Sequence, residues 1–178
     1  MEVCIITGSI REENTTEKVS QAFAAAIKEK NIPYSVLSLL PFDTLFTGTF
    51  VYLESATGAQ REELEKMYRA TTLVFVVPTY YKGMPGALKN FFDLVRSSEV
   101  YANKTIAFIS SNHKNQEYGA RQALEVMMGL SLFFKMHITV VPEILIQNQA
   151  EINKNENKNE MRRFVELLEE YTPTAIKI

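Results

Sequence analysis

The residues best suited to chemistry lie in one stretch, residues 78–90, with the sequence PTYYKGMPGALKN. Tyr80 and Tyr81 combine flat apolar rings with polar hydroxyls, which suits contact with a planar ligand at a partly wet site. Gly83 allows the backbone to approach such a ligand closely, and Thr79 adds a hydrogen-bonding hydroxyl. The pattern predicts a loop that holds a flat ligand with polar edges. The alternative is a tight connection from strand to helix that binds nothing.

A second polar loop, residues 8–16, follows the first apolar run of the chain. It offers hydroxyl, amide and guanidinium donors just before a predicted helix, in the side chains of Ser9, Arg11, Asn14, Thr15 and Thr16. Donors at a helix N-terminus suit a phosphate group. Glu12 and Glu13 place negative charge nearby, which weakens anion binding unless both side chains point to solvent. Asn14, with Glu17 three residues later, resembles a capping box. A capped helix start without a ligand would give the same pattern.

The elements around residues 78–90 place this loop at one edge of a sheet. Residues 73–77, LVFVV, predict a strand that is buried on both faces and ends at Pro78. Pro85 suits the first position of a helix. Apolar residues then recur along one helical face, at Leu88, Phe91, Phe92 and Val95. In open α/β sheets ligands bind at the carboxyl ends of such strands.

The rest of the chain repeats this alternation. We expect strands at 3–7, 34–40, 104–110 and 138–141, the last resuming at 144–146, and helices from about residue 15, over 60–70, from near residue 119 and around 161–168. Residues 42–59 show no period, residues 153–159 read as a solvated connector, and the tail after Pro173 reads as frayed. Five strand–helix units predict an α/β fold: a three-layer sandwich whose five-stranded parallel sheet has the order 2-1-3-4-5. We expect one domain, residues 1–178.

Composition excludes several classes of function. The net charge of −2 in 178 residues gives no basic field for nucleic acid. Neither His113 nor His137 has partners at metal-ligand spacing, so no metal site is expected. Cys4 is the single cysteine and lies in an apolar run, where it packs as a small hydrophobe. With no signal peptide and no apolar run near the ~20 residues that span a bilayer, we expect a cytoplasmic protein without membrane contact.

The pattern P-x-Y-x-x-G-x-P-G-x-L-K-N in residues 78–90 resembles the NADPH-dependent FMN reductase family of flavodoxin-like proteins. The resemblance implies that this loop wraps the isoalloxazine ring of FMN and that the G-S-x-R loop at residues 8–11 holds its phosphate. It also implies that residues 110–119 cover the far edge of the ring. The implied cofactor-binding residues are Ser9, Arg11, Asn14, Thr15, Thr16, Pro78, Thr79, Tyr80, Tyr81, Lys82, Gly83, Ser111 and Asn112.

The chain departs from the family pattern in two loops. Asn14 and Thr16 stand where Ser and Asn are usual, and Asn112, His113 and Lys114 replace a glycine-rich stretch. A weaker grip on FMN, or a narrower opening for the second substrate, would follow from these departures.

The resemblance implies an NAD(P)H-dependent FMN oxidoreductase. NADPH or NADH would pass a hydride to the flavin N5, and a small acceptor such as a free flavin, a quinone or an azo compound would then be reduced by a ping-pong mechanism. No catalytic side chain is expected. The alternatives are a flavodoxin-type electron carrier and a flavin-free binding protein of the same fold. Apolar residues run far around the helix that ends near Phe134. They indicate either deep cover by the sheet or burial in a homodimer or homotetramer.

Overall fold

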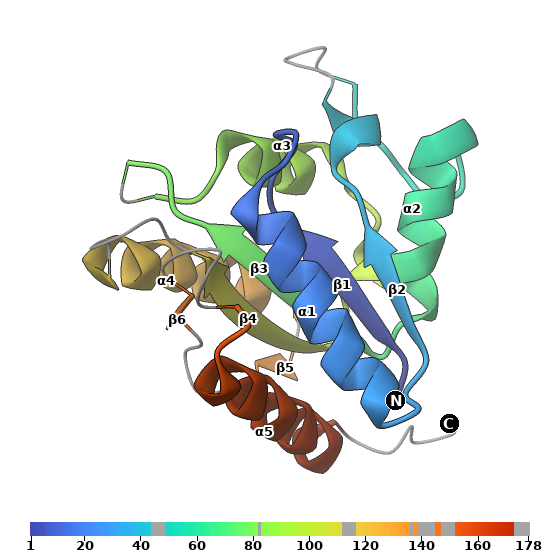
Figure 1. Cartoon of the computed structure of the whole chain (residues 1–178). Helices are drawn as coiled ribbons and strands as arrows, with labels where there is room; N and C mark the ends of the chain where they lie inside the picture. Colours follow the sequence, from blue (N-terminus) through green and yellow to red (C-terminus); the bar gives the residue numbers. More distant parts are fainter. Residues whose placement is uncertain are drawn as a thin grey trace.

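The computed structural model describes residues 1–43, 49–81, 83–111, 117–135, 137–138, 145–146 and 152–172. A parallel sheet forms its middle layer, with helices on both faces (Figure 1). The described strands are β1 (Val3–Thr7), β2 (Tyr34–Leu37), β3 (Thr72–Pro78), β4 (Thr105–Ser111), β5 (His137–Ile138) and β6 (Leu145–Ile146). The described helices are α1 (Thr15–Glu29), α2 (Gly58–Arg69), α3 (Gly86–Leu94), α4 (Glu117–Phe133) and α5 (Asn155–Tyr171), with short 3₁₀ turns at Leu40–Phe42 and Ser98–Val100.

The strands are ordered β2-β1-β3-β4, and β4 then pairs with both β5 and β6, all in parallel. The predicted α/β class and the order of the first four strands are confirmed. Of the strand predicted at 138–141, the structure describes only Ile138, in β5, and residues 139–144 lie outside the described residues. Two strands of two residues each occupy the edge beside β4, at its amino end and its carboxyl end.

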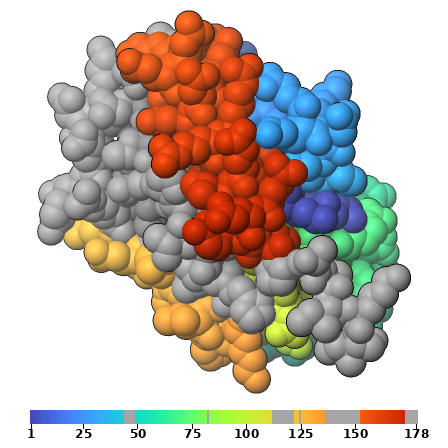
Figure 2. Space-filling view, turned by 90° about the horizontal axis from the view of Figure 1, so that it is seen from below, coloured from blue at the N-terminus to red at the C-terminus, as the bar shows by residue number. Residues whose placement is uncertain are grey.

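Successive side chains along β1, β3 and β4 point to opposite faces of the sheet and pack into two separate hydrophobic cores. In β3, Val74 and Val76 point into the core under α1 and α5, while Leu73, Phe75 and Val77 join the core under α2, α3 and α4. This alternation explains why the strand reads as an uninterrupted apolar run. Figure 2 shows α5 lying along α1 on one outer face of the molecule. Phe23 and Phe164 join these two helices, edge to face, with their ring centroids 5.2 Å apart.

Three predicted boundaries were wrong. The strand predicted at 34–40 ends at Leu37, because the N–H of Ser38 donates to the Glu63 carboxylate at 3.1 Å. Pro78 is the last residue of β3 and lies beside Ser111 in the ladder instead of stopping the strand before it. Pro85 is the N-cap of α3, so the helix begins one residue later than predicted.

The connector predicted at 153–159 was also wrong, since α5 begins at Asn155. Its polar residues lie on the outside of a helix whose buried stripe is Met161, Phe164, Val165 and Leu168. In the part of the chain predicted to be irregular, residues 44–48 lie outside the described residues. Val51 forms a parallel bridge to Val95, and α2 begins at Gly58, two residues before the predicted start. The tail after Pro173 also lies outside them.

Candidate functional site

A cavity of about 510 Å³ lies where the chain leaves the carboxyl ends of β1, β3 and β4. Its lining comes from the loop between β1 and α1 (the first loop), the start of α1, the loop between β3 and α3 (the aromatic loop) and the end of β4: Arg11, Glu12, Glu13, Asn14, Thr15, Thr16, Thr79, Tyr80, Tyr81 and Ser111. Three segments that are distant in sequence therefore meet around one cavity, at the sheet edge where open α/β folds bind ligands.

Gly8 brings the first loop against β3. Its N–H donates to the Val76 carbonyl at 2.9 Å. A Cβ atom on Gly8 would lie 2.7 Å from that carbonyl oxygen and 3.1 Å from the Pro78 ring. A side chain at this position would push the two segments apart, so glycine is what allows the first loop and the aromatic loop to share a cavity.

The start of α1 is capped by Asn14, as the sequence predicts. The Asn14 side-chain oxygen accepts the N–H of Glu17 at 2.7 Å, and its amide nitrogen donates to the Arg11 carbonyl. This pair of bonds fixes the first loop onto the helix. The N–H groups of a first helical turn lack intrahelical partners and carry the positive end of the helix dipole. The cavity thus contains a site suited to an anion beside the Arg11 guanidinium.

Tyr80 connects the two loops. Its hydroxyl lies 3.1 Å from the Ser9 hydroxyl, and the Arg11 guanidinium carbon lies 4.3 Å from the centre of its ring. These contacts place the Tyr80 side chain at the end of the cavity formed by the first loop. Its neighbour Tyr81 is fully exposed, with a φ of 48°.

A tight turn presents Tyr81. The N–H and carbonyl of Tyr80 exchange hydrogen bonds with those of Gly83, at 3.1 and 3.0 Å. Two-residue turns of this kind favour positive φ, which the Tyr81 backbone adopts. The turn holds an exposed aromatic ring at the mouth of the cavity, where a planar ligand can meet it.

Thr79 lines the cavity and carries a buried hydroxyl. The residue is 7% exposed, and its hydroxyl oxygen has no hydrogen-bond partner among the described residues. An unpaired buried hydroxyl destabilises a protein by about 1–3 kcal/mol. A ligand with a polar edge that reaches this atom would supply the missing partner.

Most of the predicted site residues meet at the cavity, with some exceptions. The Ser9 hydroxyl contacts the Tyr80 hydroxyl, and Ser9 lines a neighbouring groove. Pro78, which pairs with Ser111 in the sheet, and Gly83 do not line the cavity. Lys82 and Asn112 lie outside the described residues. Glu12 and Glu13, which the sequence places near the phosphate loop but not among the cofactor-binding residues, line the cavity with exposed side chains.

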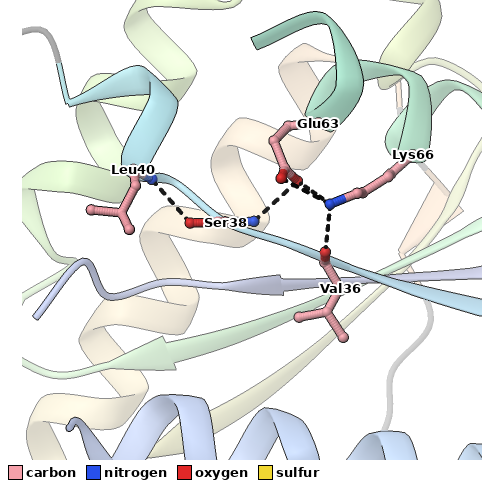
Figure 3. Close-up of polar contacts among 5 residues, drawn as sticks. All are labelled: Val36, Ser38, Leu40, Glu63 and Lys66. Carbon is pink, nitrogen blue, oxygen red and sulfur yellow. Dashed lines mark hydrogen bonds and ion pairs between the residues drawn. The ribbon is translucent and has the colours of Figure 1, made fainter. Parts of the chain in front are cut away.

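The neighbouring groove, of about 580 Å³, lies between the first loop and the end of β2. There Lys66 donates to the Glu63 carboxylate at 2.8 Å and to the Val36 carbonyl at 3.0 Å (Figure 3). Glu63 also accepts the Ser38 N–H, and the Ser38 hydroxyl accepts the Leu40 N–H at 3.2 Å. Because these groups are paired with one another, we assign the network to the attachment of α2 to β2.

Comparison with known proteins identifies the family. The model of the NADPH-dependent FMN reductase family matches residues 1–151. The chain belongs to this family. A search of curated protein sequences found no match. In the described part of the chain, no helix is long and apolar enough to cross a membrane.

Solved structures share the fold of this FMN reductase family member at low sequence identity. FerB from Paracoccus denitrificans, a flavoenzyme NAD(P)H:(acceptor) oxidoreductase, is 17% identical, with a TM-score of 0.74, and the match covers 95% of this chain and 97% of FerB. An NADH:FMN oxidoreductase in its apo form is 15% identical, with a TM-score of 0.70 and coverage of 98% and 91%. Flavodoxin 1 from Bacillus cereus is 14% identical, with a TM-score of 0.63 and coverage of 96% and 99%.

Proposed function

We propose that the protein is an FMN-dependent oxidoreductase that takes electrons from NADPH or NADH and passes them to a small acceptor. The observation that carries the proposal is the meeting of three features around one cavity: a capped helix start, the Arg11 guanidinium and the unpaired Thr79 hydroxyl. At about 510 Å³ the cavity lies within the usual range for ligand pockets, ~300–1,000 Å³. Family membership and the enzyme neighbours support the same reading.

The residues present fit FMN. Arg11, Thr15, Thr16 and the first N–H groups of α1 would hold its phosphate, while Thr79 and the tyrosines would hold its ring. Bound FMN would supply the centre that accepts a hydride and passes electrons on. The protein's part is to bind and orient, because the described cavity lining contains no histidine or cysteine and its carboxylates, Glu12 and Glu13, are exposed.

The nicotinamide and the acceptor would use the exposed mouth beside Tyr81 in turn. When two substrates occupy one opening in turn, without a ternary complex, the kinetics are ping-pong. Acceptors such as flavins, quinones and azo compounds are flat enough to lie against an aromatic ring. The two substrates should therefore give parallel lines in double-reciprocal plots.

The first test is a titration of apo-protein with FMN, followed by flavin fluorescence. We expect saturable binding that is lost in Arg11→Ala and in Tyr80→Ala. Arg163→Ala and Tyr68→Ala, which remove exposed side chains outside the cavity, should bind as the wild type does. No binding at ~1 mM, an affinity of only about 4 kcal/mol, would overturn the proposal.

A second test separates an enzyme from an electron carrier. We expect NADPH or NADH to be oxidised when a quinone or free FMN is supplied as acceptor. Tight FMN binding without turnover on any of these acceptors would favour a carrier of the flavodoxin type, a fold that the chain shares.

We also propose that α4 forms a contact between copies of the chain, in a homodimer or homotetramer. Four large apolar side chains lie on its outer face and are 43–73% exposed: Val126, Met128, Leu132 and Phe133. Its opposite face is buried through Ala123, Met127 and Ser131. Light scattering after size exclusion should show an oligomer that Leu132→Glu dissociates. A monomeric wild type would contradict this assignment.

A further inference from the structure

A pair of buried hydroxyls joins the start of α1 to the end of β4. The Thr16 and Ser111 hydroxyl oxygens lie 2.9 Å apart, although the residues are 95 positions apart in sequence. Their exposed fractions are 2% and 4%, and both line the cavity. Ser111 therefore reaches the phosphate end of the proposed site through Thr16, and not only the ring edge that the sequence indicated.

A second pair of hydroxyls holds the same helical turn from β1. Thr7 donates to the Ser20 hydroxyl at 2.9 Å, and Ser20 donates to the Thr16 carbonyl at 3.0 Å. Thr7 and Ser20 are buried. Apolar packing of α1 is non-directional, whereas hydrogen bonds require a defined distance and angle. These hydroxyls therefore set where the N–H groups at the start of α1 point.

The Thr16–Ser111 pair retains one hydroxyl hydrogen that it can donate to a ligand. Each hydroxyl carries one hydrogen, and their mutual bond uses one of the two. The other hydrogen has no partner among the described residues and lies on a group that lines the cavity. A buried donor of this kind suits an acceptor, and a phosphate oxygen is a strong one.

We infer that Ser111 is a positioning residue for the phosphate end of the site: it holds Thr16 and the first turn of α1 so that the protein distinguishes FMN from riboflavin, which lacks the phosphate. The inference rests on the proposed binding of FMN. It assigns Ser111 to the phosphate end of the ligand, whereas the family resemblance implied the ring edge.

The test compares dissociation constants for FMN and for riboflavin, measured by flavin fluorescence. In Ser111→Ala we expect FMN to bind about tenfold more weakly, because Thr16 and the first turn of α1 lose the hydrogen bond that holds them, while riboflavin changes less than about twofold. Thr16→Ala should behave alike. The double variant should be no worse than either single variant, because each removes the same bond.

Two further variants serve as controls. Thr16→Ser keeps the hydroxyl and should keep the preference for FMN. Ser131→Ala removes a buried serine hydroxyl that bonds within α4, at the Met127 carbonyl, and should leave both constants unchanged.

Three results would overturn the inference. Equal weakening of both ligands in Ser111→Ala would place Ser111 at the ring, and no weakening of either would leave the pair without a role in binding. A wild type that binds riboflavin and FMN equally would show that there is no phosphate recognition to position. Failure of the wild type to bind FMN at all would overturn the proposed function itself, a result that is distinct from these three.

Discussion

The polar groups compared at the amino and carboxyl ends of the parallel strands differ in their hydrogen-bond partners. Just before β1 and β3, Glu2 and Thr71 satisfy each other: the Glu2 N–H donates to the Thr71 hydroxyl at 3.0 Å, and the Thr71 N–H donates back to the Glu2 carbonyl at 2.9 Å. Just before β4, the Lys104 ammonium donates to the carbonyls of Tyr68 and Ala70. At the carboxyl end, the Thr79 hydroxyl has no partner in the part of the chain that the structure describes, and Tyr81 is fully exposed.

The difference lies in the cavity: the buried hydroxyls of Ser35 and Tyr101, toward the amino end, also lack partners among the described residues, but neither residue lines the cavity as Thr79 does. Burial lowers the pKa of Lys104, yet its ammonium caps the last carbonyls of α2 and needs no ligand. At the opposite end, Gly8 and the Thr16–Ser111 pair hold the cavity-lining segments together, and the Thr79 hydroxyl has no partner among the described residues. Substitutions at the amino end should therefore change stability alone, and those at the carboxyl end should change ligand binding.

The largest effect is expected from Gly8→Val. Its side chain would collide with the Val76 carbonyl and separate the first loop from β3. We expect a loss of about 1–3 kcal/mol in the free energy of unfolding, together with loss of FMN binding. Urea denaturation and FMN titration measure the two effects. Gly129→Ala, on an open face of α4, is the control and should not lower either quantity. A stable variant that binds FMN normally would show that the close contact is unnecessary.

Lys104→Met tests the amino end. Two carbonyls would lose their donor, and we expect the free energy of unfolding to fall by about 1–3 kcal/mol. The dissociation constant for FMN should stay unchanged. Lys89→Met, which removes an exposed lysine paired with Asp93, should cost less than about 1 kcal/mol. A clear change of FMN affinity in the Lys104 variant would mean that the two ends are coupled.

Thr79→Val should separate stability from binding. Removing an unpaired buried hydroxyl should leave the free energy of unfolding unchanged or raise it. FMN should bind about tenfold more weakly, because about 1.4 kcal/mol corresponds to one hydrogen bond. Thr72→Val is the matched variant at the amino end. Its hydroxyl bonds to Thr172 at 3.0 Å, so it should lose stability and keep its affinity. If Thr79→Val lost stability and kept its FMN affinity while Thr72→Val kept its stability and lost FMN affinity, the roles assigned to the two ends of the sheet would be reversed.

Cys4, in the core between the two ends, provides the smallest effect. Burial raises its pKa from 9.0 to about 12, so the folded state keeps the thiol neutral while the unfolded state ionises it above pH 9. Its contribution to stability is complete below pH 9 and is lost as the pH rises. At pH 9.5 we expect a loss of about 0.8 kcal/mol relative to pH 7, absent in Cys4→Ala. Burial raises the pKa of Tyr101 as well. Its contribution to the pH dependence of stability is present in both the wild type and Cys4→Ala, so it does not affect their difference.

Sequence patterns predicted what depends on neighbours in the chain. The strand–loop–helix unit around residues 73–95 and the Asn14 cap follow from apolar period and from capping chemistry, and the structure confirms both. The polarity of residues 153–159 was misread because it reports exposure, which an outer helical face produces as readily as a loop. The early end of β2 depends on Glu63, 25 residues later than Ser38, and no local pattern predicts that bond.

The same limit applies to the site. Residue types singled out Arg11, Thr79 and Tyr80, which line one cavity in the structure. They did not reveal that Tyr80 bonds to Ser9 across 71 residues, or that Ser111 bonds to Thr16. Such contacts depend on the register of β1, β3 and β4, which only the assembled sheet defines.

The bond between Thr16 and Ser111 also has a consequence for folding kinetics. It closes a separation of 95 residues, so the complete cavity exists only after β4 has joined β3 and the start of α1 has docked. A ligand that requires the complete cavity stabilises the native state without stabilising a transition state in which β4 is still unpaired. FMN should then slow the unfolding of this protein while leaving its refolding rate unchanged.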